Sequence, residues 1–151
     1  MGRATIRAAV AADAGAIRDC VDAAYGHYVE RLGRKPGPML DDYASIIGAR
    51  PVHVAELDGS IVGMLVLDET AEGFLLETVG VDPRVKGTGI GRLLIEFAES
   101  EARRKGHASL YLYTHEKMTE NQALYARNGY VEYTRRTEDG LARVFMRKRL
   151  R

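Results

Sequence analysis

Three alternating glycines, Gly87, Gly89 and Gly91, are the residues of this sequence best suited to binding a ligand. They lie in residues 81–106, which are predicted to form a strand end, a glycine-rich turn and a long amphipathic helix. Glycine lets neighbouring backbone N–H groups point at one ligand, and a helix N-terminus adds unsatisfied donors and partial positive charge. The turn therefore predicts a site for a phosphate or pyrophosphate, as in a nucleotide-like cofactor.

Several known glycine turns can be compared with this one. A P-loop requires GxxxxGK[ST], which the chain lacks. A dinucleotide-binding turn requires GxGxxG, but the position of its last glycine holds Arg92 or Leu94, depending on the starting glycine. A glycine C-cap or a tight packing turn would bind nothing. An acyl-coenzyme A site, in which the turn holds the pyrophosphate, is the remaining interpretation.

Glu77, which precedes this turn, and Tyr125, much farther along the chain, carry groups that could transfer protons. Glu77 lies in the otherwise apolar segment LLETVGV, where a carboxylate must pair, face solvent or have a raised pKa. A raised pKa would suit a general base, whereas an ion pair or a solvated strand position would not require catalysis. Tyr125 carries a phenol that stays protonated at neutral pH and can donate, although it could equally be a core tyrosine.

The elements that must position these residues follow from the hydrophobic pattern. We expect strands at residues 5–9, 52–57, 61–67, 74–81, 110–113, 130–137 and 142–146, with a hairpin turn at Asp58-Gly59. Helices are expected at residues 14–28 with Asp13 as N-cap, 41–47, 90–105, and 120–128 with a Thr119–Gln122 capping box. A helix between two strands indicates a βαβ crossover, so the fold class is α/β with a mixed sheet.

The helix after the glycines has a predicted apolar stripe at the spacing of one helical face. Its members are Ile90, Leu93, Leu94, Phe97 and Ala98. Glu99 and Arg103 lie outside this stripe, four residues apart, and are expected to form an exposed pair.

The chain resembles the GNAT superfamily of N-acetyltransferases. The family signature [QR]-x-x-G-x-[GA] matches residues 86–91, KGTGIG, with Lys86 in place of Gln or Arg. The family's LYxxxGF matches residues 124–130, LYARNGY, with Tyr130 in place of Phe. The usual N-x-x-A before this motif is absent, because Met118 and Asn121 stand there, so Asn121 is a candidate only through its own position. The resemblance implies a three-layer fold with a mixed, mostly antiparallel central sheet and flanking helices.

The resemblance also implies roles for particular residues. Acetyl-coenzyme A would be the co-substrate, and a primary amine would attack it directly in a ternary complex. Tyr125 would be the general acid and Glu77 the general base. The cofactor-binding candidates are Val79, Val81, Lys86, Gly87, Thr88, Gly89, Ile90, Gly91, Arg92 and Asn121. The candidates for the acceptor are Tyr25, Tyr28 and Met39.

Some residues outside the motifs have two interpretations. Asp41 and Asp42 could attract a cationic amine or stabilise a helix N-terminus. His115 follows a strand and could reach the cleft or lie at the surface.

Composition narrows the class of protein. The 151 residues, expected to form a single domain over 1–151, carry 22 basic and 21 acidic groups, which favours neither nucleic acid nor a membrane surface. With Cys20 as the only cysteine and no HExxH, we expect no metal, and with no signal peptide or long apolar span we expect a cytoplasmic protein. The expected partner is a small-molecule or peptide amine, and the chain could also form a homodimer. Two alternative functions stay open: a non-catalytic module that binds or senses acyl-coenzyme A, and a transferase of another acyl group.

Overall fold

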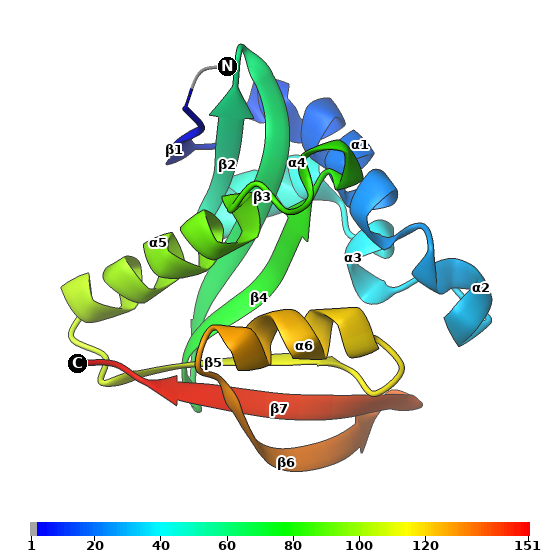
Figure 1. Cartoon of the computed structure of the whole chain (residues 1–151), viewed down its shortest axis with the longest axis vertical. Coiled ribbons are helices and arrows are strands. Elements are labelled where there is room, and N and C mark those ends of the chain that lie inside the picture. The colour runs from blue at the N-terminus through cyan, green and yellow to red at the C-terminus, as the bar shows by residue number, and fades with distance from the viewer. Residues whose placement is uncertain (1–2) are drawn as a thin grey trace.

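A computed structural model describes residues 3–151, in which seven strands form one sheet with helices on both faces (Figure 1). The strands are β1 (Thr5–Ala8), β2 (Val52–Leu57), β3 (Ser60–Thr70), β4 (Gly73–Val81), β5 (Ser109–His115), β6 (Val131–Glu138) and β7 (Leu141–Arg149). The helices are α1 (Ala14–Tyr25), α2 (Tyr28–Leu32), α3 (Gly37–Leu40), α4 (Tyr43–Ala49), α5 (Ile90–Arg104) and α6 (Thr119–Arg127), with 3₁₀ turns η1 (Ala11–Asp13) and η2 (Pro83–Val85).

Strand β3 shows why helices are needed on both faces of the sheet. Successive side chains of a strand point to opposite faces, and β3 is buried on both. Met64 and Val66 pack in the core under α1 and α4, whereas Leu65 and Leu67 pack in the core under α5. The predicted three-layer α/β fold is confirmed.

The two strands in the middle of the sheet, β4 and β5, separate along part of their length, and the candidate site lies where they separate. Its order is β1-β2-β3-β4-β5-β7-β6, and β4 and β5 are the parallel pair in an otherwise antiparallel sheet. They pair only where residues 74–76 face 110–112, and Figure 1 shows the strands diverging beyond that point. The register of β4 against β3 shifts at Glu77, which is the extra residue of a β-bulge. Bulges bend a strand and re-aim its side chains, so Glu77 lies where the two strands separate.

The first helix differs from the prediction at both ends. Asp13 belongs to η1 and accepts a hydrogen bond from the Val10 N–H at 2.8 Å, while its carboxylate also pairs with Arg7, so it does not cap α1. The helix ends at Tyr25, and a tighter turn follows in which Val29 N–H donates to Gly26 O at 3.2 Å. The predicted helix 14–28 is therefore two helices, α1 and α2.

The buried face of α5 also differs from the predicted stripe. Leu93 is 37% exposed, whereas Ile95 and Ala102 are fully buried. The buried face is rotated by roughly a quarter-turn relative to the predicted one, at about 100° per residue. Glu99 is consequently buried, accepts from Tyr130 Oη at 2.9 Å and pairs with Lys148 Nζ at 3.1 Å. The predicted exposed pair of Glu99 with Arg103 was wrong.

Candidate active site

The glycine turn leaves a row of backbone donors free at the start of α5. Gly87 and Gly89 have φ angles of 79° and 91°, in the left-handed region that disfavours residues with a Cβ. Leu93 N–H donates to Gly89 O at 2.9 Å, the first bond of the helix. Within residues 3–151, the backbone N–H groups of residues 87 and 89–92 find no acceptor. No acidic residue lies in the first turn of α5, so the positive end of the helix dipole is not offset there.

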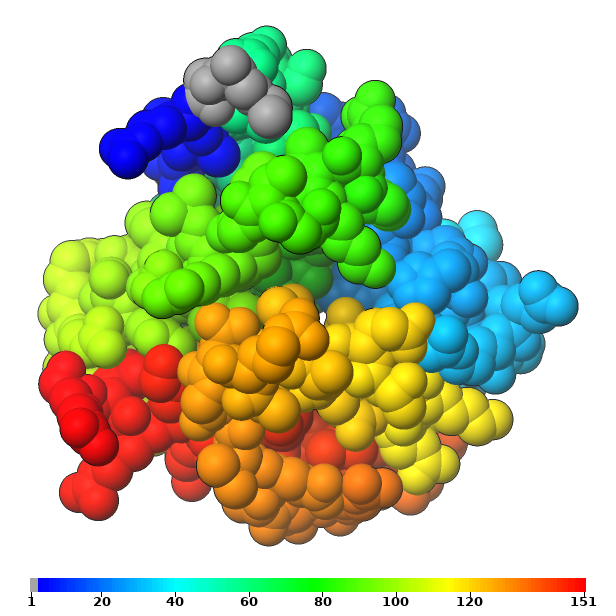
Figure 2. All heavy atoms as spheres, viewed as in Figure 1, coloured from blue at the N-terminus to red at the C-terminus, as the bar shows by residue number. Residues whose placement is uncertain are grey.

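These donors open onto a cavity of about 990 Å³ between α5, α6 and the end of β4. Figure 2 shows the surface hollowed where the glycine turn (bright green), the first helices (blue) and α6 (orange) meet. All of the cofactor-binding candidates line this cavity except Thr88, whose hydroxyl donates to Val85 O. Lys86 and Arg92 add positive charge beside the free N–H groups. The donor set suits a phosphate or pyrophosphate, and the extended end of β4 lies beside it.

A second, smaller pocket of about 260 Å³ lies on the other side of the separated strands. Glu77 and Tyr125 line this second pocket together with residues of β5, β7 and the segment before α4. Tyr25 and Asn121 line both cavities and so mark the place where they meet. This arrangement brings the predicted acid and base to one pocket and the predicted cofactor residues to the other.

The environment of Glu77 combines burial with one ion pair. Its side chain is 14% exposed, and burial raises its pKa, while the Arg50 guanidinium, in direct ion-pair contact, opposes that rise. The ion-pair interpretation from the sequence is therefore observed, with a partner that the sequence pattern did not indicate. Because Arg50 directly follows α4 and Glu77 lies on β4, only the packing of that helix against the sheet brings them together.

Tyr125 and Tyr25 are both buried, but their hydroxyl groups differ in their hydrogen bonds. Burial raises the pKa of Tyr125 well above its usual value, so its phenol stays protonated and can donate a hydrogen bond. Its hydroxyl makes no hydrogen bond within the described part of the chain and lies at the second pocket. The Tyr25 hydroxyl instead donates to Val79 O at 2.8 Å, which holds the end of β4 in place.

The three residues predicted to contact the acceptor lie in different places. Tyr25 lines both cavities, and Tyr28 lines the larger one, where its buried hydroxyl has no partner among residues 3–151. Met39 lines neither cavity, and its carbonyl accepts from Arg18 Nη1 at 2.5 Å. Tyr28 thus lies at the cavity predicted for the cofactor, Tyr25 lies where the two cavities meet, and Met39 lines neither.

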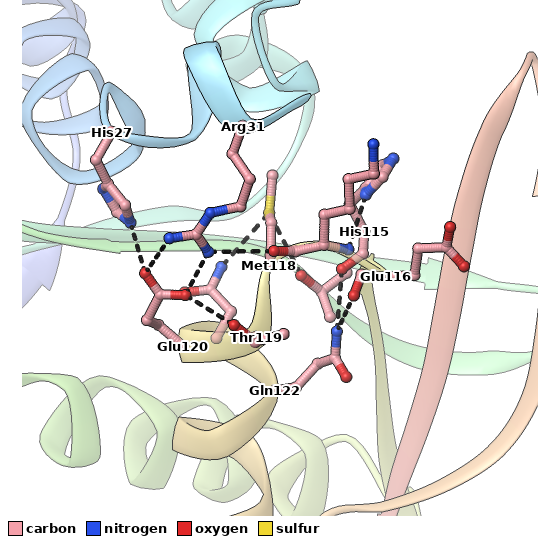
Figure 3. Close-up of polar contacts among 11 residues, drawn as sticks. His27, Arg31, His115, Glu116, Met118, Thr119, Glu120 and Gln122 are labelled. Carbon is pink, nitrogen blue, oxygen red and sulfur yellow. Dashed lines mark hydrogen bonds and ion pairs between the residues drawn. The ribbon is translucent and has the colours of Figure 1, made fainter. Parts of the chain in front are cut away.

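An ion-pair clasp joins α2 to α6 beside the larger cavity (Figure 3). We define the clasp as His27, Arg31 and Glu120. Arg31 donates to both Glu120 carboxylate oxygens at 2.5 and 3.0 Å, and His27 Nε2 lies 3.4 Å from the same carboxylate. His27 and Glu120 also line the cavity, so the clasp forms part of its wall.

The start of α6 is built without the predicted capping box. Figure 3 shows the Thr119 hydroxyl donating to the Glu120 carboxylate at 3.0 Å instead of capping the helix. Gln122 donates its amide to the carbonyls of His115 and Glu116, at 3.2 and 3.0 Å, which ties α6 to the end of β5. The helix was predicted nearly in place, but the box was wrong because the preceding loop supplies better partners.

Two further findings concern residues 3–151 as a whole. No helix there is long and apolar enough to cross a membrane. No group of three or more His, Cys, Asp or Glu side chains within these residues could hold a metal ion. Cys20 is buried in α1.

Comparison with known proteins places the chain in a family. The family model for the acetyltransferase (GNAT) domain matches residues 48–132, which include β4, the glycine turn and α6. The chain therefore belongs to the GNAT acetyltransferase family. No curated protein sequence matches it significantly.

Solved structures with the same fold cover the whole chain at low identity. The PaiA N-acetyltransferase of Thermoplasma acidophilum, in complex with coenzyme A, is 18% identical with a TM-score of 0.81, covering 98% of this chain and 99% of that one. The ribosomal-protein-S18-alanine N-acetyltransferase of Escherichia coli is 22% identical with a TM-score of 0.76, covering 98% and 94%. The protein yncA of Salmonella typhimurium, with its cofactor acetyl-coenzyme A, is 23% identical with a TM-score of 0.72, covering 99% and 95%. At these identities the likeness establishes the fold.

Proposed function

We propose that this chain is a single-domain N-acetyltransferase that transfers the acetyl group of acetyl-coenzyme A to a primary amine. The observation that carries the proposal is the meeting of two cavities at the separated strands. One holds a row of free backbone donors, and the other holds a half-buried carboxylate and a protonated phenol. Two solved structures with the same fold, from Thermoplasma acidophilum and Salmonella typhimurium, contain coenzyme A or acetyl-coenzyme A.

The cofactor would lie along the larger cavity. The free N–H groups of residues 87 and 89–92 would receive its pyrophosphate, with Lys86 and Arg92 beside them. The backbone of Val79 and Val81, which has no strand partner on the β5 side, would hold the pantetheine arm. Asn121, where the cavities meet, would lie close to the reacting end. When bound, acetyl-coenzyme A supplies the thioester whose carbonyl carbon is attacked and whose sulfur departs.

The residues of the second pocket would accept and donate the protons of the reaction. An amine with a pKa near ~10.4 must lose a proton to attack, which costs roughly 4–5 kcal/mol at pH 7. The Glu77 carboxylate would accept that proton, directly or through a water, and its raised pKa brings it nearer to the operating pH. The Tyr125 hydroxyl, which has no competing partner, would donate its proton to the departing sulfur.

Two other functions predict different behaviour. A non-catalytic acyl-coenzyme A binding or sensing module would use the larger cavity alone and would not require Glu77 or Tyr125. A transferase for another acyl group would use both cavities but prefer a different thioester.

Release of coenzyme A separates these functions. We expect the purified protein, given acetyl-coenzyme A and a broad panel of primary amines, to release free thiol in an amine-dependent manner. Propionyl- and succinyl-coenzyme A serve as matched controls for acyl preference. Tight binding of acetyl-coenzyme A without thiol release across the panel would identify a binding module, and faster release from a longer thioester would identify another acyl group.

A further inference from the structure

Charged side chains line the smaller pocket in two groups that come from different elements. Asp41, Arg50 and Glu77 come from the segments before and after α4 and from β4. His115 and Arg143 come from β5 and β7, where they are directly opposite each other in the strand register. We name these the acidic wall and the basic wall. Such a separation of charges carries information about the ligand, because a buried ionic group requires a partner of opposite sign.

Two carboxylates and one guanidinium form the acidic wall, and the Arg18 guanidinium lies behind it, where it donates to the Asp41 carbonyl. Arg50 forms an ion pair with Glu77, which leaves the Asp41 carboxylate over. Within residues 3–151, the Asp41 carboxylate forms no hydrogen bond or ion pair, although the residue is partly buried. Burial raises the pKa of Asp41, and the nearby Arg50 and Arg18 guanidinium groups oppose that rise. The two carboxylates together suit an ammonium group.

The basic wall offers donors that are suited to an anion. One nitrogen of Arg143, Nη1, is held by Glu138 at 2.9 Å, and the guanidinium lies 4.5 Å from the centre of the Tyr113 ring. Its other N–H groups have no acceptor within the described residues. Lys117 N–H donates to His115 Nδ1 at 3.0 Å, so the neutral imidazole carries its proton on Nε2. Burial lowers the pKa of His115, which favours this neutral form.

We propose that the amine acceptor is a small amino acid-like zwitterion, with its ammonium group on the acidic wall and its carboxylate on Arg143 and His115. This inference rests on the proposed acetyl transfer, because it names the acceptor of the same site. A volume of about 260 Å³ suits a small molecule. A guanidinium binds a carboxylate through two parallel hydrogen bonds, so Arg143 would orient the amine toward Glu77 and the thioester as well as bind the ligand.

The test compares the standard amino acids with their carboxamides, which keep the amine and lose the negative charge. Thermal unfolding and calorimetry of the protein loaded with coenzyme A measure binding without requiring turnover. We expect at least one amino acid to bind at least about tenfold more tightly than its carboxamide, the effect of one charge-assisted contact. Equal or tighter binding of the carboxamides, or no binding of either series at millimolar concentration, overturns the inference.

Variants of two arginines locate the effect. Arg143→Gln should abolish the preference for the free acid and change affinity for the carboxamide by no more than about twofold, while Arg143→Lys should restore part of it. The matched control is Arg136→Gln, on β6, where Arg136 lies over the Phe145 ring, pairs with Glu72 and lines neither cavity. A preference that survives Arg143→Gln overturns the inference.

The two proposals can fail separately. An amino acid that binds with the expected preference but causes no release of coenzyme A from acetyl-coenzyme A contradicts the transferase and supports the zwitterion site. Rapid release with amines that lack a carboxylate, together with no preference for the free amino acids, supports the transferase and contradicts the zwitterion site.

Discussion

The two cavities beside β4 differ in the groups that they present to a ligand. The larger one presents backbone N–H groups of the glycine turn and the start of α5, with the charged side chains of Lys86 and Arg92 beside them. The smaller one presents charged and phenolic side chains from α1, β4, β5, α6, β7 and the segments that flank α4. A backbone site can be kept while many side chains change, whereas a side-chain site changes with every substitution. This difference suits a family that keeps one co-substrate and varies its acceptor.

The strongest test of this comparison is Tyr125→Phe, which removes one hydroxyl from the smaller pocket and leaves the larger cavity unchanged. If the phenol is the general acid, kcat should fall by about 100-fold or more, within the range for acid–base catalysis. Affinity for acetyl-coenzyme A, measured by calorimetry, should change by less than about twofold, because no backbone donor is altered.

Tyr133→Phe is the matched control, since Tyr133 lies on β6 with 39% of its surface exposed and contacts neither cavity. A Tyr125→Phe variant with the activity of the parent would remove Tyr125 from the mechanism and leave the smaller pocket as a binding site only.

The same difference decides what the sequence alone could predict. Gly87 and Gly89 both have positive φ angles, a conformation that favours glycine, so the glycines in the sequence indicate the local backbone conformation directly. The turn, the helix after it and the order of the seven strands were predicted, whereas α2 and α3 were not predicted as separate helices. The partner of Glu77 was not, because Arg50 reaches it only through the packing of α4 on the sheet.

The errors in α5 and α6 have a related cause. Glu99 is a charged residue that periodicity assigns to the surface, but it is buried with two partners that are distant in the sequence, Tyr130 just before β6 and Lys148 on β7. Thr119 and Gln122 match a capping pattern, but the end of β5 offers Gln122 two carbonyls. Local pattern identifies an element, whereas tertiary partners decide which of its faces is buried and how its ends are bonded.

The next largest effect is expected at the backbone of the larger cavity. Gly89→Ala places a Cβ at a φ of 91°, which should lower the free energy of unfolding by about 1–2 kcal/mol and move the N–H groups of α5. Affinity for acetyl-coenzyme A should fall about tenfold as the anion site is distorted. Urea unfolding and calorimetry measure the two effects.

Gly140→Ala is the matched control, because Gly140 also has a positive φ, of 75°, and open space at its Cβ, but lies in the β6–β7 turn. It should lose similar stability and keep its affinity. Equal loss of affinity in both variants would mean that general destabilisation, and not the donor row, weakens binding.

A smaller effect is expected from Arg50→Gln, which tests the electrostatics of the smaller pocket. Burial raises the pKa of Glu77 and Arg50 opposes that rise, so removing the guanidinium should raise the pKa further. A base acts as the carboxylate, so activity is lost as pH falls through the pKa of Glu77. The acid limb of the pH profile, in which kcat/KM falls as the pH is lowered, should therefore move to higher pH by about half to one unit.

The exposed ion pair of Arg135 with Glu132 supplies the control, since Arg135→Gln removes a guanidinium far from Glu77 and should leave the profile unchanged. Glu77→Gln should remove the acid limb altogether. An acid limb that stays in place in both Arg50→Gln and Glu77→Gln would show that another group is the base.

The smallest effect is expected at the clasp, where side chains form part of the wall of the larger cavity. The Arg31 guanidinium lowers the pKa of Glu120 to about 2, so Glu120 stabilises the fold above its ordinary pKa and loses that contribution as pH falls from 4.5 toward 2. Because Glu120 is 43% exposed, Glu120→Gln should cost less than about 1 kcal/mol at pH 7, and the difference from the parent should shrink between pH 5 and pH 3. Urea unfolding at each pH measures this difference, with Glu132→Gln as the control variant in a matched exposed ion pair.

If the larger cavity depends on backbone donors, affinity for acetyl-coenzyme A should change less than about twofold in Glu120→Gln, whereas a tenfold loss would show that this wall binds the cofactor through side chains as well.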